Sequence, residues 1–290
     1  MFEGFETRDV LTGETSIRVR IGGSGPPVLL LHGYPQTHAM WHRVAPVLAE
    51  RCTVVCADLR GYGDSGKPAS DPEHAAYCKR ASAGDMVAVM AGLGFSRFKV
   101  AGHDRGGRVA HRLALDHPER LEALAVLDIV PTRTVFGATD QALATAYYHW
   151  FFLVQPYDLP ERLIGADPVY YLRRKLGAWA ALEQFAPEAL AEYERCFADP
   201  AVIHASCEDY RAAASIDLAH DEADLDRRIQ CPLLALWGGR GVIEKHFDVL
   251  ATWREKAAGP VGGRALDCGH FLAEERPEET ARELLTFFGG

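Results

Sequence analysis

Residues 98–107 read FKVAGHDRGG, and this stretch decides the fold. Its first four residues are typical of a buried strand, and its glycines let the chain turn sharply into a helix that packs close to a sheet. In the pattern G-x-S-x-G, a strand-to-helix turn of this kind carries a nucleophilic serine. Asp104 occupies that position here, and arginines follow at 105 and 108. The sequence therefore predicts a carboxylate at the tip of a strand, with two cations beside it.

Other short apolar runs predict further strands around this one. The run 16–21 alternates apolar and polar residues, as a half-exposed antiparallel strand does, whereas most of the others are nearly continuous, as strands buried on both faces are. Helix-length segments such as 81–93 and 108–117 separate the runs, which predicts a mainly parallel α/β sheet with helices on both faces. The expected strands cover residues 16–21, 27–33, 52–58, 98–104, 123–131, 232–239 and 264–270.

A long insertion interrupts this alternation between Thr132 and Asp217. It is rich in aromatic residues, has helical patterning and contains no clear strand. We expect a helical lid over residues 132–217, and a core made of residues 1–131 and 218–290. In open α/β sheets, ligands bind beyond the carboxyl ends of the strands. The residues at or just after the ends of the predicted strands are His32, Asp58, Asp104, Asp128 and His270.

Composition limits the partners of the chain. Its 290 residues carry 31 Lys and Arg against 40 Asp and Glu, a formal charge of -9. This argues against nucleic acid or an anionic membrane as a partner, although a local basic site can still bind a small anion. The seven cysteines show no metal-binding spacing and predict reduced thiols in a cytoplasmic protein. No stretch predicts a signal peptide or a membrane span.

Three residues form a candidate catalytic set. The amides at the start of the following helix favour an ionised Asp104, although an aspartate there can also simply cap the helix. Asp128 closes the next strand, and His270 lies in DCGHF after the last one, in the chain order nucleophile, acid, histidine. A histidine base needs an orienting acid, for which we choose Asp128. Asp267 is nearer in sequence, but we expect it to face away from the ring, and Asp128 itself has a plainer interpretation as a loop or capping acid.

Two further motifs flank this set. HGYPQT at 32–37 should bring the amide of Tyr34 opposite the turn, where it and the amide of Arg105 would form an oxyanion hole. DLRGYGDSGKP at 58–68 is rich in glycine but has no phosphate-binding lysine-serine pair, so we interpret it as structural. Arg105 and Arg108 oppose the helix macrodipole by about 0.3–1 kcal/mol each, so they need an anionic partner. That partner is either a substrate carboxylate or a protein acid such as Asp104 or Asp128.

Taken together, HGYP, DLRGYGDS, GHDRGG, DCGHF and the lid resemble the α/β-hydrolase superfamily over nearly the whole chain. More narrowly, residues 102–118 and 149–165 and the placement of Asp128 are similar to the fluoroacetate (haloacetate) dehalogenases. The resemblance implies Asp104 as nucleophile, with Asp128 and His270 completing the triad. It also implies that Arg105 and Arg108 bind the substrate carboxylate.

The same resemblance implies that His149, Trp150 and Tyr210 bind the departing halide, because their N–H and O–H groups can donate hydrogen bonds to it. Without the resemblance, packing inside the lid would explain these three side chains better. Tyr34 adds a hydroxyl where the family often has a phenylalanine.

The implied reaction is displacement at saturated carbon by the Asp104 carboxylate, a nucleophile that needs no deprotonation. The resulting ester is hydrolysed by water that His270 activates, so neither a metal nor an organic cofactor is needed. The expected partner is a short haloacid, and a homodimer is compatible with the resemblance. One alternative is an epoxide hydrolase with the same nucleophile, in which hydroxyls such as those of Tyr147, Tyr148 and Tyr210 would bind the epoxide oxygen. The arginine pair argues against its neutral substrate. A second alternative, a non-catalytic binder, is disfavoured by the intact triad.

Overall fold

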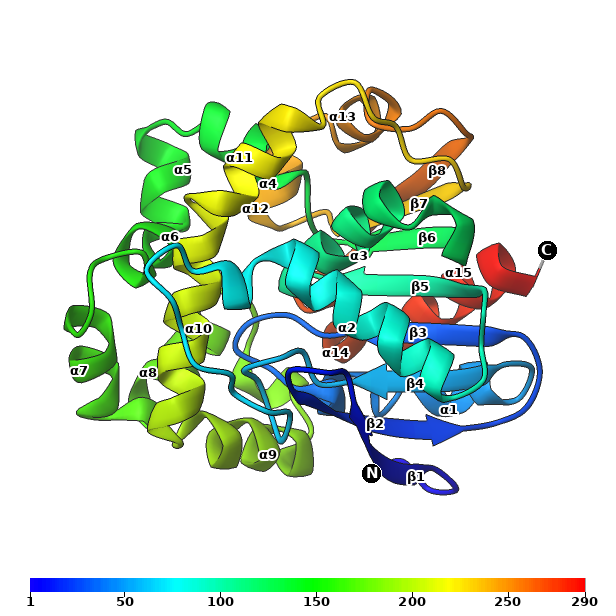
Figure 1. Ribbon diagram of the computed structural model, residues 1–290, viewed down its shortest axis with the longest axis horizontal. Helices are drawn as coiled ribbons and strands as arrows, with labels where there is room; N and C mark the ends of the chain where they lie inside the picture. Colours follow the sequence, from blue (N-terminus) through cyan, green and yellow to red (C-terminus); the bar gives the residue numbers. More distant parts are fainter. Residues whose placement is uncertain (290) are drawn as a thin grey trace.

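The computed structural model describes residues 1–289, and its centre is a twisted eight-stranded sheet (Figure 1). The strand order is β1-β2-β4-β3-β5-β6-β7-β8. Strand β2 runs antiparallel to both of its neighbours, and every pairing from β4 to β8 is parallel. The strands are β1 (Glu6–Leu11), β2 (Ser16–Gly22), β3 (Pro27–Leu31), β4 (Thr53–Ala57), β5 (Phe98–His103), β6 (Leu121–Leu127), β7 (Leu233–Gly238) and β8 (Val261–Leu266). The predicted mainly parallel sheet is confirmed.

Burial along the strands follows their apolar patterns. The central strands β3, β5 and β6 are almost wholly buried, whereas β2 alternates, with Ile17 and Val19 facing the core. The sequence-based predictions were least accurate for the two edge strands, β1 and β8. Strand β1 was not predicted, because its mostly exposed residues ETRDVL form no apolar run. Strand β8 begins at Val261 rather than at residue 264, and only its last residue is buried.

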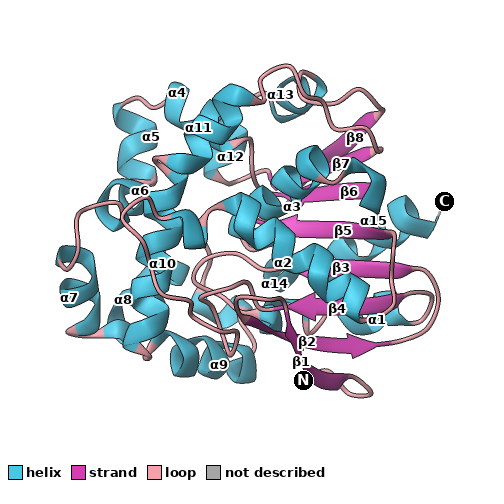
Figure 2. Cartoon of the chain, in the orientation of Figure 1, coloured by secondary structure: helices cyan, strands magenta, loops and turns pink. Residues whose placement is uncertain are grey.

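Helices cover both faces of the sheet, as Figures 1 and 2 show. On one face α2 (Lys79–Gly92) and α3 (Arg105–Asp116) pack against each other, and on the other α1 (Ala45–Ala49) contacts α15 (Pro277–Gly289). Residues 105–115 of α3 are all buried, which places its first turn deep in the molecule. The shorter core elements are η1 (His38–Trp41), η2 (Ala75–Tyr77), η3 (Pro118–Arg120), α12 (Val242–His246), α13 (Val249–Arg254) and α14 (Leu272–Glu275).

Between β6 and β7 the chain folds into a layer of helices beyond the carboxyl ends of β5 and β6, at the left of Figure 1. Helix α10 is central to it and contacts α6, α7, α9 and α11. The helices are α4 (Thr132–Gly137), α5 (Gln141–Ala146), α6 (Tyr148–Leu153), α7 (Leu159–Gly165), α8 (Pro168–Gly177), η4 (Leu182–Gln184), α9 (Pro187–Phe197), α10 (Pro200–Ala213) and α11 (Ile216–Ala223). Among residues 1–289, no helix has the length and apolar character needed to cross a membrane.

Candidate active site

The turn between β5 and α3 holds Asp104 in a conformation that few side chains adopt. Its backbone has φ 45° and ψ -114°. The turn is so tight that a Cβ on Gly102 would lie 2.4 Å from the carbonyl oxygen of Gly106, and a Cβ on Gly106 would lie 2.4 Å from the carbonyl oxygen of His32. Glycine is therefore required at 102 and 106, because the neighbouring backbone approaches too closely for any side chain. Strained positions of this kind occur at functional sites, where the surrounding structure holds them.

The Asp104 carboxylate is buried but kept ionised. Burial acts to raise the pKa of Asp104, but the interactions with the neighbouring His270 and with the guanidinium groups of Arg108 and Arg105 outweigh burial and hold the pKa below its ordinary value. The amide of Tyr34 donates to Oδ2 at 3.0 Å. An ionised carboxylate with an aimed backbone donor is a nucleophile ready to act without prior deprotonation.

Asp128 and His270 meet beside this turn. Nδ1 of His270 donates to Oδ2 of Asp128 at 2.6 Å, and the amide of Gly238 donates to the other oxygen at 2.9 Å. Within residues 1–289, Nε2 of His270 is buried without a hydrogen-bond partner. Because Nδ1 carries the proton, Nε2 is the basic nitrogen and can accept a proton from water. Asp267 does not compete, since its side chain is 76 % exposed and pairs with Arg240.

The loop that carries His270 is fixed on both sides. Oε2 of Glu275 accepts from the amide of Gly269 at 2.8 Å, and Oε1 accepts from the amide of Phe271 at 3.0 Å. Nε2 of His103 donates to the carbonyl of His270 at 2.8 Å. Burial lowers the pKa of His103 to about 3, so its ring is neutral and acts as a structural donor.

Arg105 is completely buried and bonded to an acid that the sequence analysis did not name. Its Nε donates to Oδ2 of Asp209 at 2.6 Å, and Nη2 donates to the carbonyl of Asp209 at 2.8 Å. The hydroxyl of Tyr62 and the ammonium of Lys79 bind the same carboxylate. Burial opposes ionisation of Asp209, but these cations outweigh it and hold its pKa far below the ordinary value. Nη1 of Arg105 is left buried without a partner among residues 1–289.

Arg108 lies one turn along α3, and the hydrogen-bond partners that it has within residues 1–289 are neutral. Nη1 donates to the carbonyl of Val130 at 3.0 Å and to the hydroxyl of Thr132 at 3.1 Å, and the guanidinium lies 4.6 Å from the ring centroid of Trp150. No ion pair joins Arg108 to a carboxylate within residues 1–289. Burial therefore lowers its pKa from the ordinary 12.5. A buried guanidinium without a counter-ion is a binding site for an anion.

Aromatic rings from the insertion close over these charges. His149 and Trp150 come from α6 and Tyr210 from α10, and the Tyr210 ring lies 5.7 Å from that of His149 and 6.2 Å from that of Trp150. The Tyr34 ring contacts both His149 and Tyr210. The hydroxyl of Tyr210 is buried without a partner within the described chain. The residues predicted to bind halide are thus brought together, although their role stays a prediction.

The remaining predicted residues are placed as follows. Tyr147 is buried, whereas Tyr148 is exposed. A cavity of about 170 Å³ leads to Asp128 and His270 and is also lined by Tyr147, Trp179, Arg240 and Lys245.

The turn at 58–68 is held together by Asp58, whose carboxylate accepts from His38 and from the amide of Asp64. Its closed hydrogen bonding agrees with the structural interpretation.

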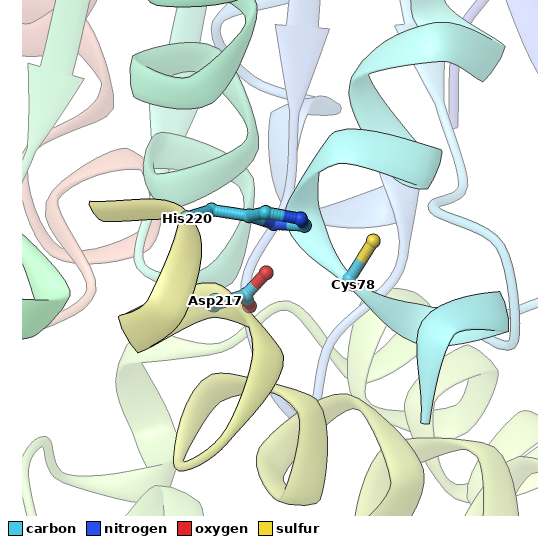
Figure 3. Close-up of side chains that lie close together, drawn as sticks. All are labelled: Cys78, Asp217 and His220. Carbon is cyan, nitrogen blue, oxygen red and sulfur yellow. The ribbon is translucent and has the colours of Figure 1, made fainter. Parts of the chain in front are cut away.

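One cluster outside the site has metal-ligating side chains. Cys78, Asp217 and His220 converge, with their ligand atoms within 4.8 Å of one another (Figure 3). Two of them already have structural tasks, because Sγ of Cys78 accepts from the amide of Ala81 and Oδ1 of Asp217 accepts from the amide of Lys79. The ammonium of Lys79 lies 3.6 Å from the other oxygen of Asp217. A cation beside the one charged ligand disfavours a metal ion, so we interpret the cluster as helix capping.

Three supporting residues escaped the sequence analysis: Asp209, Glu275 and Lys175. Asp209 acts through a contact with Arg105, 104 positions away, which no local pattern reveals. Glu275 accepts from the amides of Gly269 and Phe271, which lie six and four positions before it, but its sequence context shows no motif for this contact. Lys175 did leave a signal, since it lies on the buried face of α8 together with Leu172 and Leu176. A lysine at an apolar position of an amphipathic helix is rare unless it has a partner.

Comparisons with known proteins agree with this geometry. Residues 26–277 match the family model of the alpha/beta hydrolase fold. A fluoroacetate dehalogenase from Burkholderia sp is 50% identical over 99% of this chain and 95% of its own length. A soluble epoxide hydrolase from Corynebacterium sp. (strain C12) is 36% identical over 92% of this chain and 91% of its own. A protein from Nostoc sp PCC 7120, provisionally described as an alpha/beta hydrolase, is 60% identical, superposes with a TM-score of 0.98 and covers 99% of both chains.

Proposed function

We propose that the chain, which belongs to the alpha/beta hydrolase family and is 50% identical to a fluoroacetate dehalogenase, hydrolyses the carbon–halogen bond of short 2-haloacids. Fluoroacetate would give glycolate and fluoride. All of the residues that would contact the substrate are nearly closed off from solvent. A site this enclosed suits a substrate of very few atoms, which favours haloacetates over longer haloacids.

In the first step, a carboxylate oxygen of Asp104 attacks the carbon that bears the halogen, in line with the carbon–halogen bond. The electron pair of that bond leaves with the halide, and an ester joins Asp104 to the acid. Arg105 and Arg108 hold the substrate carboxylate, which orients the carbon for attack. His149, Trp150 and Tyr210 donate hydrogen bonds to the departing halide, which stabilises its developing charge.

In the second step, Nε2 of His270 removes a proton from water, and the hydroxide attacks the carbonyl carbon of the Asp104 ester. The amides of Tyr34 and Arg105 hold the oxyanion, and Asp128 stabilises the protonated ring of His270. When the intermediate collapses, the alkoxide of the product leaves and is protonated by His270, and the second proton of the attacking water is released to solvent. Asp104 is returned as a carboxylate.

The observation that carries this proposal is the state of Arg108. It is a buried guanidinium on the turn after the nucleophile, and its protein partners are neutral oxygens. An epoxide is uncharged, so this buried cation would be offset only in part by the nearby Asp104 carboxylate, with which it makes no ion pair within residues 1–289, and a buried ion without a paired partner costs several kcal/mol. The epoxide hydrolase alternative keeps two buried tyrosines, Tyr147 and Tyr210, and is therefore tested in the same experiment.

The experiment measures halide release from fluoro-, chloro- and bromoacetate with ion-selective electrodes, beside diol formation from styrene oxide. We expect fluoride release and no diol. The His270→Ala variant should release about one halide per site and then stop, because alkylation needs only the carboxylate. Intact-protein mass spectrometry should then find one carboxymethyl group on the peptide that contains Asp104. Diol formation without halide release would replace the proposal by the epoxide hydrolase alternative.

Residues 132–217 would act as a lid on the core formed by residues 1–131 and 218–290. In support, the insertion supplies His149, Trp150 and Tyr210, while the core supplies Asp104, Asp128 and His270. Each part alone therefore holds half of the proposed site.

The proposed assembly is a homodimer in the cytoplasm. All but two of the exposed large hydrophobic side chains within the described chain lie between residues 148 and 170, on the surface of the insertion. Exposed apolar side chains that gather on one part of a protein support an interface there. Light scattering should give a dimer mass, and Leu163→Glu together with Tyr170→Glu should give a monomer. The seven buried free cysteines suit a reducing compartment, which fractionation of the source cells would test.

A further inference from the structure

Lys175 is a buried lysine in the wall of the proposed halide site. It lies on α8, is 2 % exposed, and places Nζ 2.7 Å from Nδ1 of His149. Its ammonium lies 4.0 Å from the ring centroid of Trp179 and 5.1 Å from that of Tyr148. Within residues 1–289 it makes no ion pair with a carboxylate. The other buried lysine, Lys79, is by contrast bound to Asp209.

A lysine in such surroundings lowers the stability of the fold. Burial lowers the pKa of Lys175 to about 7 from the ordinary 10.5, and the charge of Asp104 opposes this shift. Aromatic faces and one imidazole nitrogen offset only part of the cost of desolvating an ammonium. An apolar residue of similar length, such as methionine, would fill the same space at lower cost. The packing of α8 therefore does not explain why a lysine stands at this position.

The contact with His149 has a chemical consequence. The protonated form of Lys175 has three donors and no acceptor, so Nδ1 of His149 is the acceptor whenever Lys175 carries its charge. Burial and the charge of Lys175 hold the pKa of His149 well below the ordinary 6.5, so the ring is neutral and has a single N–H. With Nδ1 occupied as acceptor, that proton is on Nε2. The other tautomer would turn a lone pair, instead of a donor, away from the lysine.

We propose that Lys175 is a positioning residue for halide departure, which fixes His149 in the Nε2–H tautomer so that the ring donates to the leaving halide. The inference rests on the proposed function, because it assigns a donor to that reaction. Lys175 also places a positive charge directly behind the imidazole. Hydrogen bonds in such a chain polarise one another, which strengthens the N–H donor.

Fluoride should depend on this arrangement more than the other halides do. Fluoride carries its charge on the smallest volume, so its departure depends most on aimed donors. Loss of a single preorganised donor typically costs about 10²–10³ in rate. We therefore expect Lys175→Met to lower kcat/KM for fluoroacetate by roughly 10²-fold, and for bromoacetate by less than about tenfold.

The first arm of the test reads the tautomer without any turnover. Nitrogen-15 NMR of imidazole-labelled protein distinguishes a protonated from an unprotonated ring nitrogen, and a His149→Gln spectrum assigns the signals. In the wild type we expect Nε2 of His149 to be protonated and Nδ1 to be the acceptor. Lys175→Met should shift the ring to a mixture of tautomers. An unchanged tautomer in Lys175→Met would overturn the proposal, whatever the kinetics.

The second arm measures fluoride and bromide release by Lys175→Met, Lys175→Arg and Arg174→Met. The guanidinium of the Arg variant also only donates, so Lys175→Arg should keep the fluoride-to-bromide ratio of the wild type. Arg174→Met removes an exposed charge from the same helix turn and should change neither rate. The melting temperature of Lys175→Met should not fall, because a costly buried charge is removed. Equal losses for both halides, or a lower melting temperature, would indicate a structural lysine.

The two arms separate failure of the inference from failure of the proposed function. If the wild-type protein releases no halide from any haloacetate, the proposed function fails. The tautomer measurement still decides whether Lys175 sets the His149 ring.

Discussion

Replacing Arg108 by methionine should abolish the preference for a substrate carboxylate. The side chain is 3 % exposed, and within residues 1–289 its only acceptors are the carbonyl of Val130 and the hydroxyl of Thr132. Two unit charges about 4 Å apart interact by about 4 kcal/mol at an effective dielectric constant of 20. Hydrogen bonds to charged groups contribute about 1.5–3 kcal/mol net. A loss of about 2–4 kcal/mol lowers kcat/KM for fluoroacetate by roughly 30- to 1,000-fold, since each 1.36 kcal/mol is a factor of ten.

The assay compares fluoroacetate with the neutral fluoroacetamide, using fluoride release from both. The acid should lose the full factor in Arg108→Met, whereas slow release from the amide should change by less than about threefold. Arg133→Met, which removes an exposed guanidinium, serves as the control and should leave both rates unchanged. Equal losses for acid and amide would show that Arg108 supports the fold of the site and does not bind a carboxylate, and the argument from its missing counter-ion would be refuted.

Three further predictions concern other parts of the structure. In Asp128→Asn, Asp104 should still be alkylated, but the ester should be hydrolysed at least about 10²-fold more slowly, because an amide can hold the His270 ring in the wrong tautomer. Mass spectra should therefore show the adduct accumulating, and steady turnover without an adduct would contradict this role of Asp128. Burial acts to raise the pKa of Asp58, but His38 and His32 outweigh burial and lower the pKa to about 2. The ionised carboxylate should therefore contribute roughly 2 kcal/mol of stability, which is complete above its ordinary pKa of 3.8 and is lost as the pH falls towards 2. The free energies of unfolding of Asp58→Asn and wild type, measured in urea, should differ at pH 7 and converge near pH 2. Lys245→Glu, in the wall of the cavity that His270 also lines, should lower kcat/KM for fluoroacetate at low salt and have little effect at 0.5 M salt, whereas a salt-independent loss would argue against steering of the anion.

The parts of the site that the sequence predicted are those that end strands. Asp104 and Asp128 follow neighbouring strands β5 and β6, and parallel strands bring their carboxyl ends to one edge of the sheet. The contact of His270 with Asp128 follows from the same rule, since β8 lies next to β7 and β7 next to β6. Patterns along the chain are sufficient here because the sheet converts order in sequence into neighbours in space.

The partners of the cations could not be predicted in the same way. Arg105 pairs with Asp209, which lies 104 positions away in the sequence. The pattern of apolar residues in the helix that carries Asp209 does not indicate which residues that helix packs against. Before the fold is known, any of several acids could serve, and the sequence analysis named only Asp104 and Asp128. The sequence analysis missed Lys175 in the same way, because the contact that explains its burial is with His149 on another helix.

Binding of a carboxylate should be coupled to the uptake of protons by the site. The free protein holds Lys175 close to its midpoint at neutral pH, since burial lowers its pKa to about 7. A substrate carboxylate between Arg105 and Arg108 adds a negative charge to a closed, poorly solvated site, which favours protonated Lys175 and raises its pKa. Binding of the unreactive analogue acetate at pH 7.5 should therefore take up protons. Calorimetry in buffers of different ionisation enthalpy measures this uptake. It should vanish in Lys175→Met, because burial keeps His149 neutral. Undiminished uptake in that variant would assign the proton to His270 instead, and would mean that Lys175 is already charged before the anion binds.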